Sequence, residues 1–453
     1  MALKSDELYA ILNKKIEEGG GGGGGTKNYN ELSNKPQING VELYGNMLPS
    51  DLGLADEESV LGIEANIESI SEELDALKNY ILVSDRPTTW LEVDSAVTNG
   101  LAKDIYAIGD MFSDFKWIDT ETNISYDYDM QVNHFEDVEL ENGTIRKDAM
   151  WVQAHWAHPF GIQFTHQRAF LKCPNGLSAG TYYFTFESDW GSNGYVVAGE
   201  SVSFTITNDV PVGGRIAGCY DALRQAKSNW RIYVYDSDGL NVIETVIPTF
   251  EATGTNLGVQ HLNRREGNLN STQEMGLGSN RWKTSAIRQY LNSSAGKGEW
   301  WTAWDEWDIA PDQLKTKAGF LSGCSQDFID AIKTIKVTTY TNTVNEEGSA
   351  DITYDKVILP SLEQIYVNPQ IQGEGEYHQY WKEKSGANSP LAQYGTYPNM
   401  ITYAAENHNS PQPVSCRSAD RGSVVSRWHV SSGGYVNGYA ASNAFRFSPI
   451  VVI

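Results

Sequence analysis

Apolar side chains recur along residues 56–84 at alternating spacings of three and four residues. The apolar positions are Val60, Ile63, Ile67, Ile70, Leu74, Leu77 and Ile81. This heptad spacing predicts a coiled coil, and isoleucine at both kinds of core position favours trimers over dimers. We therefore expect these residues to form the trimerisation seam of a homotrimer. The alternative is an amphipathic helix that packs on its own domain.

A second amphipathic pattern lies near the N-terminus, in residues 3–18. Its apolar residues follow helical spacing, and a run of glycines at 19–25 then ends the helix. A short helix on a flexible tether suits a peptide that docks on another particle, and a frayed terminus is the alternative. We predict that residues 1–25 are a docking helix with a glycine tether.

From residue 85 to residue 275 the apolar pattern changes to a period of two. The alternating residues include Tyr182, Phe184, Phe186, Val202, Phe204 and Ile206. Further apolar runs, at 232–235 and 242–247, flank an Asp-Gly turn signal. Many short strands at this spacing are typical of a β-sandwich or jelly roll. We therefore predict a β-sandwich region over residues 85–275.

The C-terminal region, residues 276–453, mixes helical and strand patterns. Helices are predicted at 281–292 and 325–333, and strands are predicted at 335–340, at 355–359 and at the extreme C-terminus. An α+β domain that is closed by a final strand is therefore expected. The whole chain is predicted to be multidomain and mainly β, with an α+β tip.

Charge and composition restrict the partners. The formal net charge of −24 disfavours a nucleic-acid partner, because phosphate binding requires clustered Lys and Arg. No window reaches the ~18 apolar residues of a membrane span, so we expect no membrane insertion. The N-terminal residues lack a secretory signal, which predicts synthesis in the cytoplasm. Four cysteines without a C-x-x-C pair are expected to be reduced, buried thiols: Cys173, Cys219, Cys324 and Cys416.

Residues 26–55 contain the segment YNELSNKPQINGVELYGN. This segment resembles one that recurs near the N-termini of phage tail-fibre and other phage appendage proteins, ahead of their distal domains. The resemblance implies a virion protein that attaches to other virion proteins through residues 1–18. It fits tail fibres and head fibres equally.

Four sequence blocks follow one another in the C-terminal region: GSNRWKTSAIRQYLNS, GFLSGCSQDFIDAI, YDKVILPSLEQIY and the block that begins CRSADRGSVVSRWHV. These blocks resemble a family of uncharacterised domains in gut bacteria and their phages that is related to the C-type-lectin-like fold. In variable proteins of diversity-generating retroelements, which share this fold, the C-terminal segment carries the ligand-contacting residues. The resemblance implies a C-type-lectin-like domain at 276–453 with a binding surface near its end.

The composition of residues 428–443 suits such a surface. The segment is rich in Trp, Tyr, His, Ser, Asn and Gly, a mixture that combines rigid rings with adaptable hydrogen bonding. We expect outward ligand contacts from Trp428, His429, Ser431, Tyr435, Asn437, Tyr439 and Asn443. The alternative is an ordinary surface hairpin that turns at Gly433 and Gly434. Arg417, Arg446 and Asp420 are expected to tie the last strand to the core.

Patterns that would indicate catalysis are weak. His155-x-x-His158, with His166 nearby, is the best metal candidate, yet strand residues three apart face opposite sides. The tryptophan-rich stretch around Glu299 and Asp308 resembles a sugar-cleaving groove only superficially, because carboxylate pairs are common in an acidic chain. P-loop and nucleophile-elbow motifs are missing. We expect no enzyme, no cofactor and no metal.

The sequence therefore favours a phage receptor-binding protein. It would be displayed on the virion and would bind a protein or glycan of a host-cell or environmental surface, with three copies adding avidity. A purely structural head-fibre or capsid-decoration protein is the first alternative. A polysaccharide-degrading enzyme, or a redox enzyme like the oxidases that share the C-type-lectin-like fold, is a weaker one.

Overall fold

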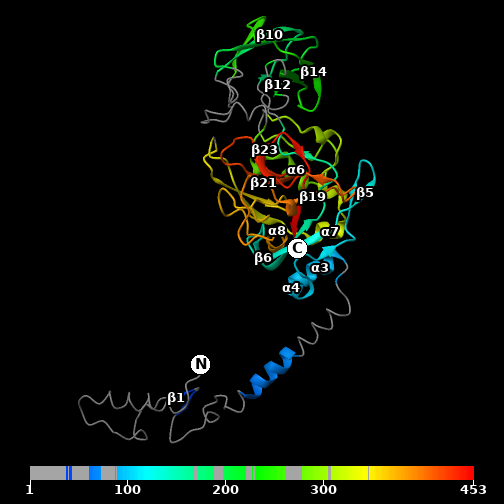
Figure 1. The fold of residues 1–453 in the computed structure, drawn as a ribbon, viewed down its shortest axis with the longest axis vertical. Helices are drawn as coiled ribbons and strands as arrows, with labels where there is room; N and C mark the ends of the chain where they lie inside the picture. The colour runs from blue at the N-terminus through cyan, green and yellow to red at the C-terminus, as the bar shows by residue number, and fades with distance from the viewer. Residues whose placement is uncertain are drawn as a thin grey trace, which may run out of the picture. The chain divides into compact units, whose positions relative to one another are not determined.

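The secondary structure of the chain, in a computed structural model, is mainly β, with several separate sheets and a few short helices (Figure 1). The structure describes residues 37–38, 40–42, 61–72, 87, 89–166, 171–187, 197–220, 227, 230–260, 278–304, 308–344 and 346–453. The chain divides into two compact units, Met1–Arg86 and Pro87–Ile453. None of the described helices is long and apolar enough to cross a membrane.

In the first unit the described residues form a small hairpin and a helix. β1 (Gln37–Ile38) pairs antiparallel with β2 (Val41–Glu42), and Gly40 lies between them. The predicted docking helix and glycine tether, residues 1–25, lie outside the described residues. The structure therefore says nothing about that prediction.

The helix of the first unit covers residues 61–72, inside the predicted coiled coil. Three of the seven predicted seam residues, Ile63, Ile67 and Ile70, lie in it and are 56–65% exposed in the single chain. The other four lie outside the described residues: Val60, Leu74, Leu77 and Ile81. The described residues show a helix but no coiled coil, so the coiled coil stays a prediction.

A five-stranded antiparallel sheet, curled into a half-barrel, organises the second unit. In sheet order its strands are β18 (Val357–Ile358), β25 (Ile450–Val452), β7 (Ile145–Ala154), β6 (Met130–Glu139) and β3 (Met111–Phe112). The last strand of the chain, β25, lies between β18 and β7, and Ile453 exchanges two backbone hydrogen bonds with Met150. The sheet thus joins strands from the start of the unit to the C-terminus.

Short helices pack against this sheet and against one another. They are α3 (Trp90–Thr98), α4 (Ala102–Ile105), α6 (Ala286–Leu291), α7 (Gln326–Ala331) and α8 (Gln379–Ser385), with 3₁₀ turns at Trp282–Thr284, Asp312–Lys315, Phe320–Gly323 and Pro398–Met400. A capping box begins α3: the Thr89 hydroxyl accepts from Glu92 N, and the Glu92 carboxylate accepts from Thr89 N. Trp90 then meets Phe328 of α7, with ring centroids 5.0 Å apart. Both rings belong to the main apolar core.

Residues 171–260 form two further sheets around an apolar core of their own. One sheet has the order β11 (Ser201–Ile206), β10 (Gly180–Phe186), β15 (Thr255–Gln260), and the other has the order β14 (Val242–Val246), β13 (Trp230–Tyr235), β12 (Gly214–Tyr220), β9 (Leu171–Cys173). Phe184 and Phe204 from the first sheet are buried in one cluster with Ile216 and Ile232 from the second. The alternation that predicted strands at 182–186 and 202–206 is confirmed.

The division of the second unit differs from the predicted one. β6 and β7 precede residue 275, yet they share a sheet and an apolar core with β25 and β18. Within the described residues, the separate core of the predicted β-sandwich region is confined to residues 171–260. Pairing between strands so distant in sequence leaves no trace in local periodicity, so the boundary predicted at residue 275 does not separate two cores.

Several small sheets complete the second unit. β21 (Val414–Ala419), β22 (Ser426–Val430) and β23 (Val436–Ala440) form a three-stranded antiparallel sheet. The two-stranded sheets are β16 (Ile335–Tyr340) with β17 (Ala350–Asp355), β19 (Thr402–Tyr403) with β20 (Pro411–Gln412), β24 (Ala444–Phe445) with β8 (Ile162–Gln163), and β4 (Lys116–Asp119) with β5 (Ile124–Asp127). The strand predicted at 335–340 coincides with β16. The helices predicted at 281–292 and 325–333 contain α6 and α7, which are shorter.

The three histidines of the discounted metal candidate do not converge. His158 is fully buried, and its Nδ1 and Nε2 lie 2.9 and 3.1 Å from the hydroxyls of Tyr128 and Tyr290. The other partners are Gln131 Oε1 for His155, at 3.1 Å, and the Tyr235 hydroxyl for His166, at 3.4 Å. Burial holds the pKa of His158 well below its usual value, so this ring is neutral in the folded chain.

The buried His158 predicts that acid destabilises the fold. Because the unfolded chain binds the proton near pH 6.5 and the folded chain does not, the contribution of His158 to stability is present above pH 6.5 and is lost as the pH falls. The loss amounts to about 1.4 kcal/mol per pH unit for this one residue. Denaturant titrations between pH 7 and about pH 5 measure it, and the His158→Gln variant should lose that part of the pH slope. Equal slopes for the two proteins would contradict the prediction.

Candidate functional site

The predicted binding segment forms the hairpin of β22 and β23. Across it, Trp428 pairs with Gly438 and His429 pairs with Asn437. Ser431 holds the turn, because its hydroxyl accepts from Gly433 N at 3.3 Å and from Tyr435 N at 3.0 Å. Gly434 has a φ of 77°, and a Cβ there would lie 2.3 Å from the carbonyl oxygen of Tyr397, so only glycine fits.

One face of the hairpin is part of an apolar core. Trp428 is 0% exposed and lies in a cluster with Val430, Val436 and Cys416. The ring of Tyr394 contacts the Trp428 ring edge to face, with centroids 5.1 Å apart. The prediction that Trp428 points outward is wrong, because this face of the strand packs against the cluster.

The opposite face of the hairpin is covered as well. The His429 ring packs against the rings of Tyr439 and Phe445, with centroids 5.6 and 4.6 Å away, and His429 is 4% exposed. Its Nδ1 donates to the carbonyl of Asn437 at 3.0 Å, and burial lowers its pKa to about 4. The prediction that His429 points outward is therefore also wrong. The cover comes from β24, which the chain places over this face on its way to β25.

A buried arginine holds that cover in place. The Arg427 guanidinium is fully buried and donates to the carbonyls of Ala440 and Asn443, each at 3.0 Å, and to the Ser415 hydroxyl at 3.0 Å. Burial lowers its pKa to about 9. The sequence prediction missed Arg427, although a lone arginine between apolar strand residues was the available signal. It ties β21, β23 and the chain before β24 together.

The other predicted contact residues are half-buried: Ser431, Tyr435, Asn437, Tyr439 and Asn443. Tyr435, Asn437 and Tyr439 alternate along β23 and so share one side of that strand. Another segment pairs with the start of β23, since Tyr394 N donates to the carbonyl of Val436 at 2.9 Å. Tyr394 is 56% exposed. We call Tyr394, Tyr435, Asn437 and Tyr439 the tyrosine edge.

A carboxylate lies beside the tyrosine edge. Asp420 Oδ1 accepts from Gln370 Nε2 at 2.9 Å, and a Cβ on Gly438 would lie 3.0 Å from Asp420 Oδ2. Burial, together with the charge of Asp420, raises the pKa of Tyr394. The edge thus offers phenol rings, an amide and one carboxylate to a ligand. Asp420 was predicted to be structural, and its Oδ1, which also accepts from Gly422 N at 3.1 Å, is engaged in that way.

The two arginines predicted to be structural bind other groups of the second unit. Arg417 is fully buried and donates to the carbonyls of Leu359 and Glu374. Arg446 forms an ion pair with Glu406, with Nη2 and Oε1 2.6 Å apart. Neither set of bonds involves β25, so the predicted tie between the last strand and the core stays a prediction.

The described carboxylates of the weaker glycosidase alternative lie in different environments. Glu299 is exposed, whereas Asp308 is buried and accepts from Trp304 N at 2.8 Å. The described cysteines Cys173, Cys324 and Cys416 are free thiols, as predicted. Cys173 and Cys416 are buried, whereas Cys324 is half-buried. Burial raises the pKa of Cys173 to about 11 and that of Cys416 to about 12, which keeps these thiols protonated and unreactive. The side chain of Cys219 lies outside the description.

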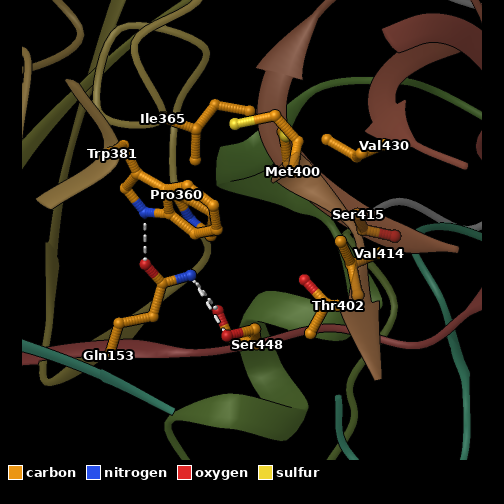
Figure 2. Close-up of a pocket in the computed structure, with 11 residues that line it drawn as sticks. Gln153, Pro360, Ile365, Trp381, Met400, Thr402, Val414, Ser415, Val430 and Ser448 are labelled. Atoms are coloured by element: carbon orange, nitrogen blue, oxygen red, sulfur yellow. Dashed lines mark hydrogen bonds between the residues drawn. The ribbon is translucent and has the colours of Figure 1, made fainter. Parts of the chain in front are cut away.

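A small pocket lies beneath the hairpin, against the central sheet (Figure 2). Trp381, Met400 and Val414 supply part of its apolar lining. Its main polar group, the Gln153 amide, is already paired, since Oε1 accepts from Trp381 Nε1 at 2.9 Å and Nε2 donates to Ser448 Oγ at 3.1 Å. A lining with its polar group satisfied is a packing feature of the core, and the pocket offers little to recognise a ligand.

One group of side chains in the described part of the chain could hold a metal ion: His134, Glu136 and Glu376. Burial, and secondly the neighbouring Glu376 carboxylate, raise the pKa of Glu136 to about 7, and burial lowers the pKa of His134. The sequence prediction missed this group. The His-x-Glu spacing in a strand was the available signal, because a period of two places both side chains on one face.

The comparisons with known proteins reach only part of the chain. Residues 258–450 match the model of a family described as a domain of unknown function, DUF6273. The matched range contains the hairpin and the tyrosine edge, but it begins after β6 and β7 of the central sheet. No curated protein and no solved structure matches the chain. The C-terminal region is thus similar to a family whose function is not known.

Burial of Trp428 predicts a large difference between two substitutions in the hairpin. Trp428→Ala should lower the free energy of unfolding by about 3–5 kcal/mol, because it leaves a cavity in the cluster. Tyr435→Ala, at the half-buried turn, should cost about 1 kcal/mol or less. Urea denaturation of the full chain measures both. If Trp428→Ala is no more destabilising than Tyr435→Ala, Trp428 is not a core residue.

Proposed function

We propose that the chain is a phage virion appendage protein that binds a host-cell or environmental surface ligand through its C-terminal lectin-like domain. The binding surface is the tyrosine edge, and the ligand is a protein or glycan. Residues 1–18 attach the chain to other virion proteins, and three copies act together. This proposal keeps the predicted segment but moves the contacts from Trp428 and His429 to the edge strand and its neighbour.

The observation that carries the proposal is the exposure of Tyr394 on a rigid support. Tyr394 is 56% exposed while its ring contacts the fully buried Trp428, which fixes the ring at little entropic cost. Tyr435 and Tyr439 are half-buried, and the Tyr439 ring also packs against His429 and Phe445. Exposed aromatic rings on a rigid framework are typical of binding sites, because they bury much area without losing many rotamers.

The finer fold assignment is part of the proposal. A lectin-like assignment of the C-terminal region is supported by the position of β25 between β18 and β7, because a final strand that closes the domain is expected of that fold. The two sheets of residues 171–260 enclose one apolar cluster, which supports a β-sandwich inserted before the matched region. The match to DUF6273 is neutral, since that family has no known function.

The rival functions have less support. A capsid-decoration or head-fibre protein would use the same edge against another virion subunit, and the tyrosines suit that role too. A polysaccharide-degrading enzyme needs two carboxylates that flank the substrate, whereas Asp308 is buried and is bound by a backbone N–H. A redox enzyme needs a thiol with a lowered pKa, whereas burial raises the pKa of Cys173 and Cys416.

Binding should depend on the tyrosine edge. With the full-length protein on arrays of bacterial capsular and surface glycans, and on whole gut-bacterial cells, Tyr394→Ala and Tyr435→Ala should each weaken binding by about tenfold or more, as truncated hot spots do. Tyr354→Ala is the matched control, since Tyr354 is 43% exposed but lies on β17. Unchanged binding after both edge substitutions would contradict the proposed surface. Binding only to purified virion subunits would favour the decoration function.

Trimer formation should depend on the apolar stripe of residues 61–72. Ile63 and Ile70 are 56% and 65% exposed in the single chain, and a partner helix in a coiled coil would bury them. Analytical ultracentrifugation should find a trimer for the natural sequence and a smaller species for the Ile63→Asp, Ile70→Asp double variant. Glu68→Lys, on the same helix but outside the seam, should leave the trimer intact. A monomeric natural sequence would contradict the coiled coil.

A further inference from the structure

Two segments that are distant in sequence bring histidines and glutamates together beside β6. His134 and Glu136 lie two positions apart in β6, opposite Trp151 and Ala149 of β7, so both side chains project from one face of the sheet. Glu376 belongs to the segment that leads into α8, and α8 packs on β6. One ligand atom from each of His134, Glu136 and Glu376 lies within 4.8 Å of the others.

Polar atoms in this cluster lack the partners that buried groups normally have. His134 Nε2 is buried and has no hydrogen-bond partner in the described part of the chain, and Glu376 Oε2 lies 3.7 Å from it. His378 is 0% exposed, and neither of its ring nitrogens has a hydrogen-bond partner among the described residues. Its ring stacks on His134, with centroids 5.2 Å apart. Unsatisfied buried nitrogens of this kind are typical where a water or an ion completes the site.

Hydrogen bonds to the neighbouring residue Glu374 fix the segment that supplies Glu376. The neighbouring Glu374 is buried and accepts from Tyr340 N at 2.8 Å, and the Ser418 hydroxyl also donates to it. Arg417 donates to the carbonyl of Glu374. Between Glu374 and Glu376, Gly375 has a φ of 143°, and a Cβ there would lie 3.0 Å from the Gln364 side chain. The backbone of Glu376 is thus fixed, whereas its side chain is 71% exposed and can rotate.

We propose that His134, Glu136 and Glu376 bind a divalent transition-metal ion of the Zn²⁺ class, with His378 packed behind His134 as a positioning residue. One imidazole and two carboxylates match the ligands that Zn²⁺ takes in proteins. The imidazole selects against Ca²⁺ and Mg²⁺, which prefer oxygen ligands throughout. Ligand atoms in a tetrahedral zinc site lie about 3.4 Å apart, given bonds of about 2.1 Å. Rotation of the exposed Glu376 side chain closes the remaining distance.

The bound ion links β6 to the segment before α8. Because these segments are far apart in sequence, the metal binds the folded chain and not the unfolded one, and it stabilises the fold by mass action. The contacts that support the metal site do not depend on ligand binding at the tyrosine edge. It departs from the expectation, drawn from the sequence, that the protein holds no metal.

Calorimetric titration of the full-length, chelator-treated protein with Zn²⁺ tests the proposal. Millimolar Mg²⁺ is kept in the buffer, because the net charge of −24 would otherwise attract cations to the surface. One Zn²⁺ should bind per chain, and the melting temperature should rise. Glu376→Gln should weaken Zn²⁺ binding by at least about tenfold, as loss of a ligand does. Replacement of Zn²⁺ by Co²⁺ should give visible absorption bands that Glu376→Gln abolishes.

Matched variants separate this site from other cations at the surface. Glu383→Gln changes an exposed glutamate of α8, and His408→Gln changes an exposed histidine, and both should bind Zn²⁺ like the natural sequence. Glu376 is exposed, so Glu376→Gln keeps the fold even if His134→Gln does not. The proposal is overturned by a folded protein that fails to bind Zn²⁺ in Mg²⁺, by unchanged affinity in Glu376→Gln, or by an equal loss in Glu383→Gln.

Discussion

The pairing of β25 with β7 is the interaction on which the second unit depends. Residues 450–453 are almost fully buried between β18 and β7, so the C-terminus is an interior strand of the main sheet. The chain must therefore return to β7 after it has made the hairpin, and on the way β24 covers the second face of that hairpin by pairing with β8. Non-local pairing of this kind forms only after most of the chain has been collected, which makes folding slow relative to local structure.

This return path explains why both faces of the β22–β23 hairpin are buried, so that the hairpin is not a free surface loop. One face contributes Trp428 to an apolar cluster, and the other buries Arg427 and His429 beneath β24. What remains for a partner is the edge strand, the turn and the segment of Tyr394. Substitutions at the edge remove little buried area, whereas those on either face disrupt packing. A surface of this kind can vary while its support stays fixed.

Local sequence patterns predicted many of the helices and strands, whereas long-range contacts determine which of them share a sheet or a core. The strand patterns predicted the residue ranges of β10, β11 and β16 correctly, because an alternation of apolar and polar residues depends only on neighbours in sequence. The sharing of one core by β6, β7 and β25 could not be predicted, since it joins opposite ends of the unit. The same limit applies to Trp428 and His429: composition identified a ring-rich hairpin, but which rings are buried depends on what β24 and the Tyr394 segment cover. The sequence could indicate only part of the proposed metal site, the pair His134 and Glu136, because the third ligand, Glu376, comes from a distant segment.

The proposed metal ligands and the tyrosine edge are linked through α8. His378 is the N-cap residue of α8, and three residues later Trp381 enters the apolar cluster that contains Trp428. Trp381 Nε1 also donates to Gln153 of β7, which joins the helix to the central sheet (Figure 2). An ion between β6 and Glu376 would therefore restrain the start of the helix whose tryptophan supports the hairpin. Because Tyr394 rests on Trp428, stiffening α8 limits the motion of the ring at the edge, and a preordered ring loses less entropy when a ligand covers it.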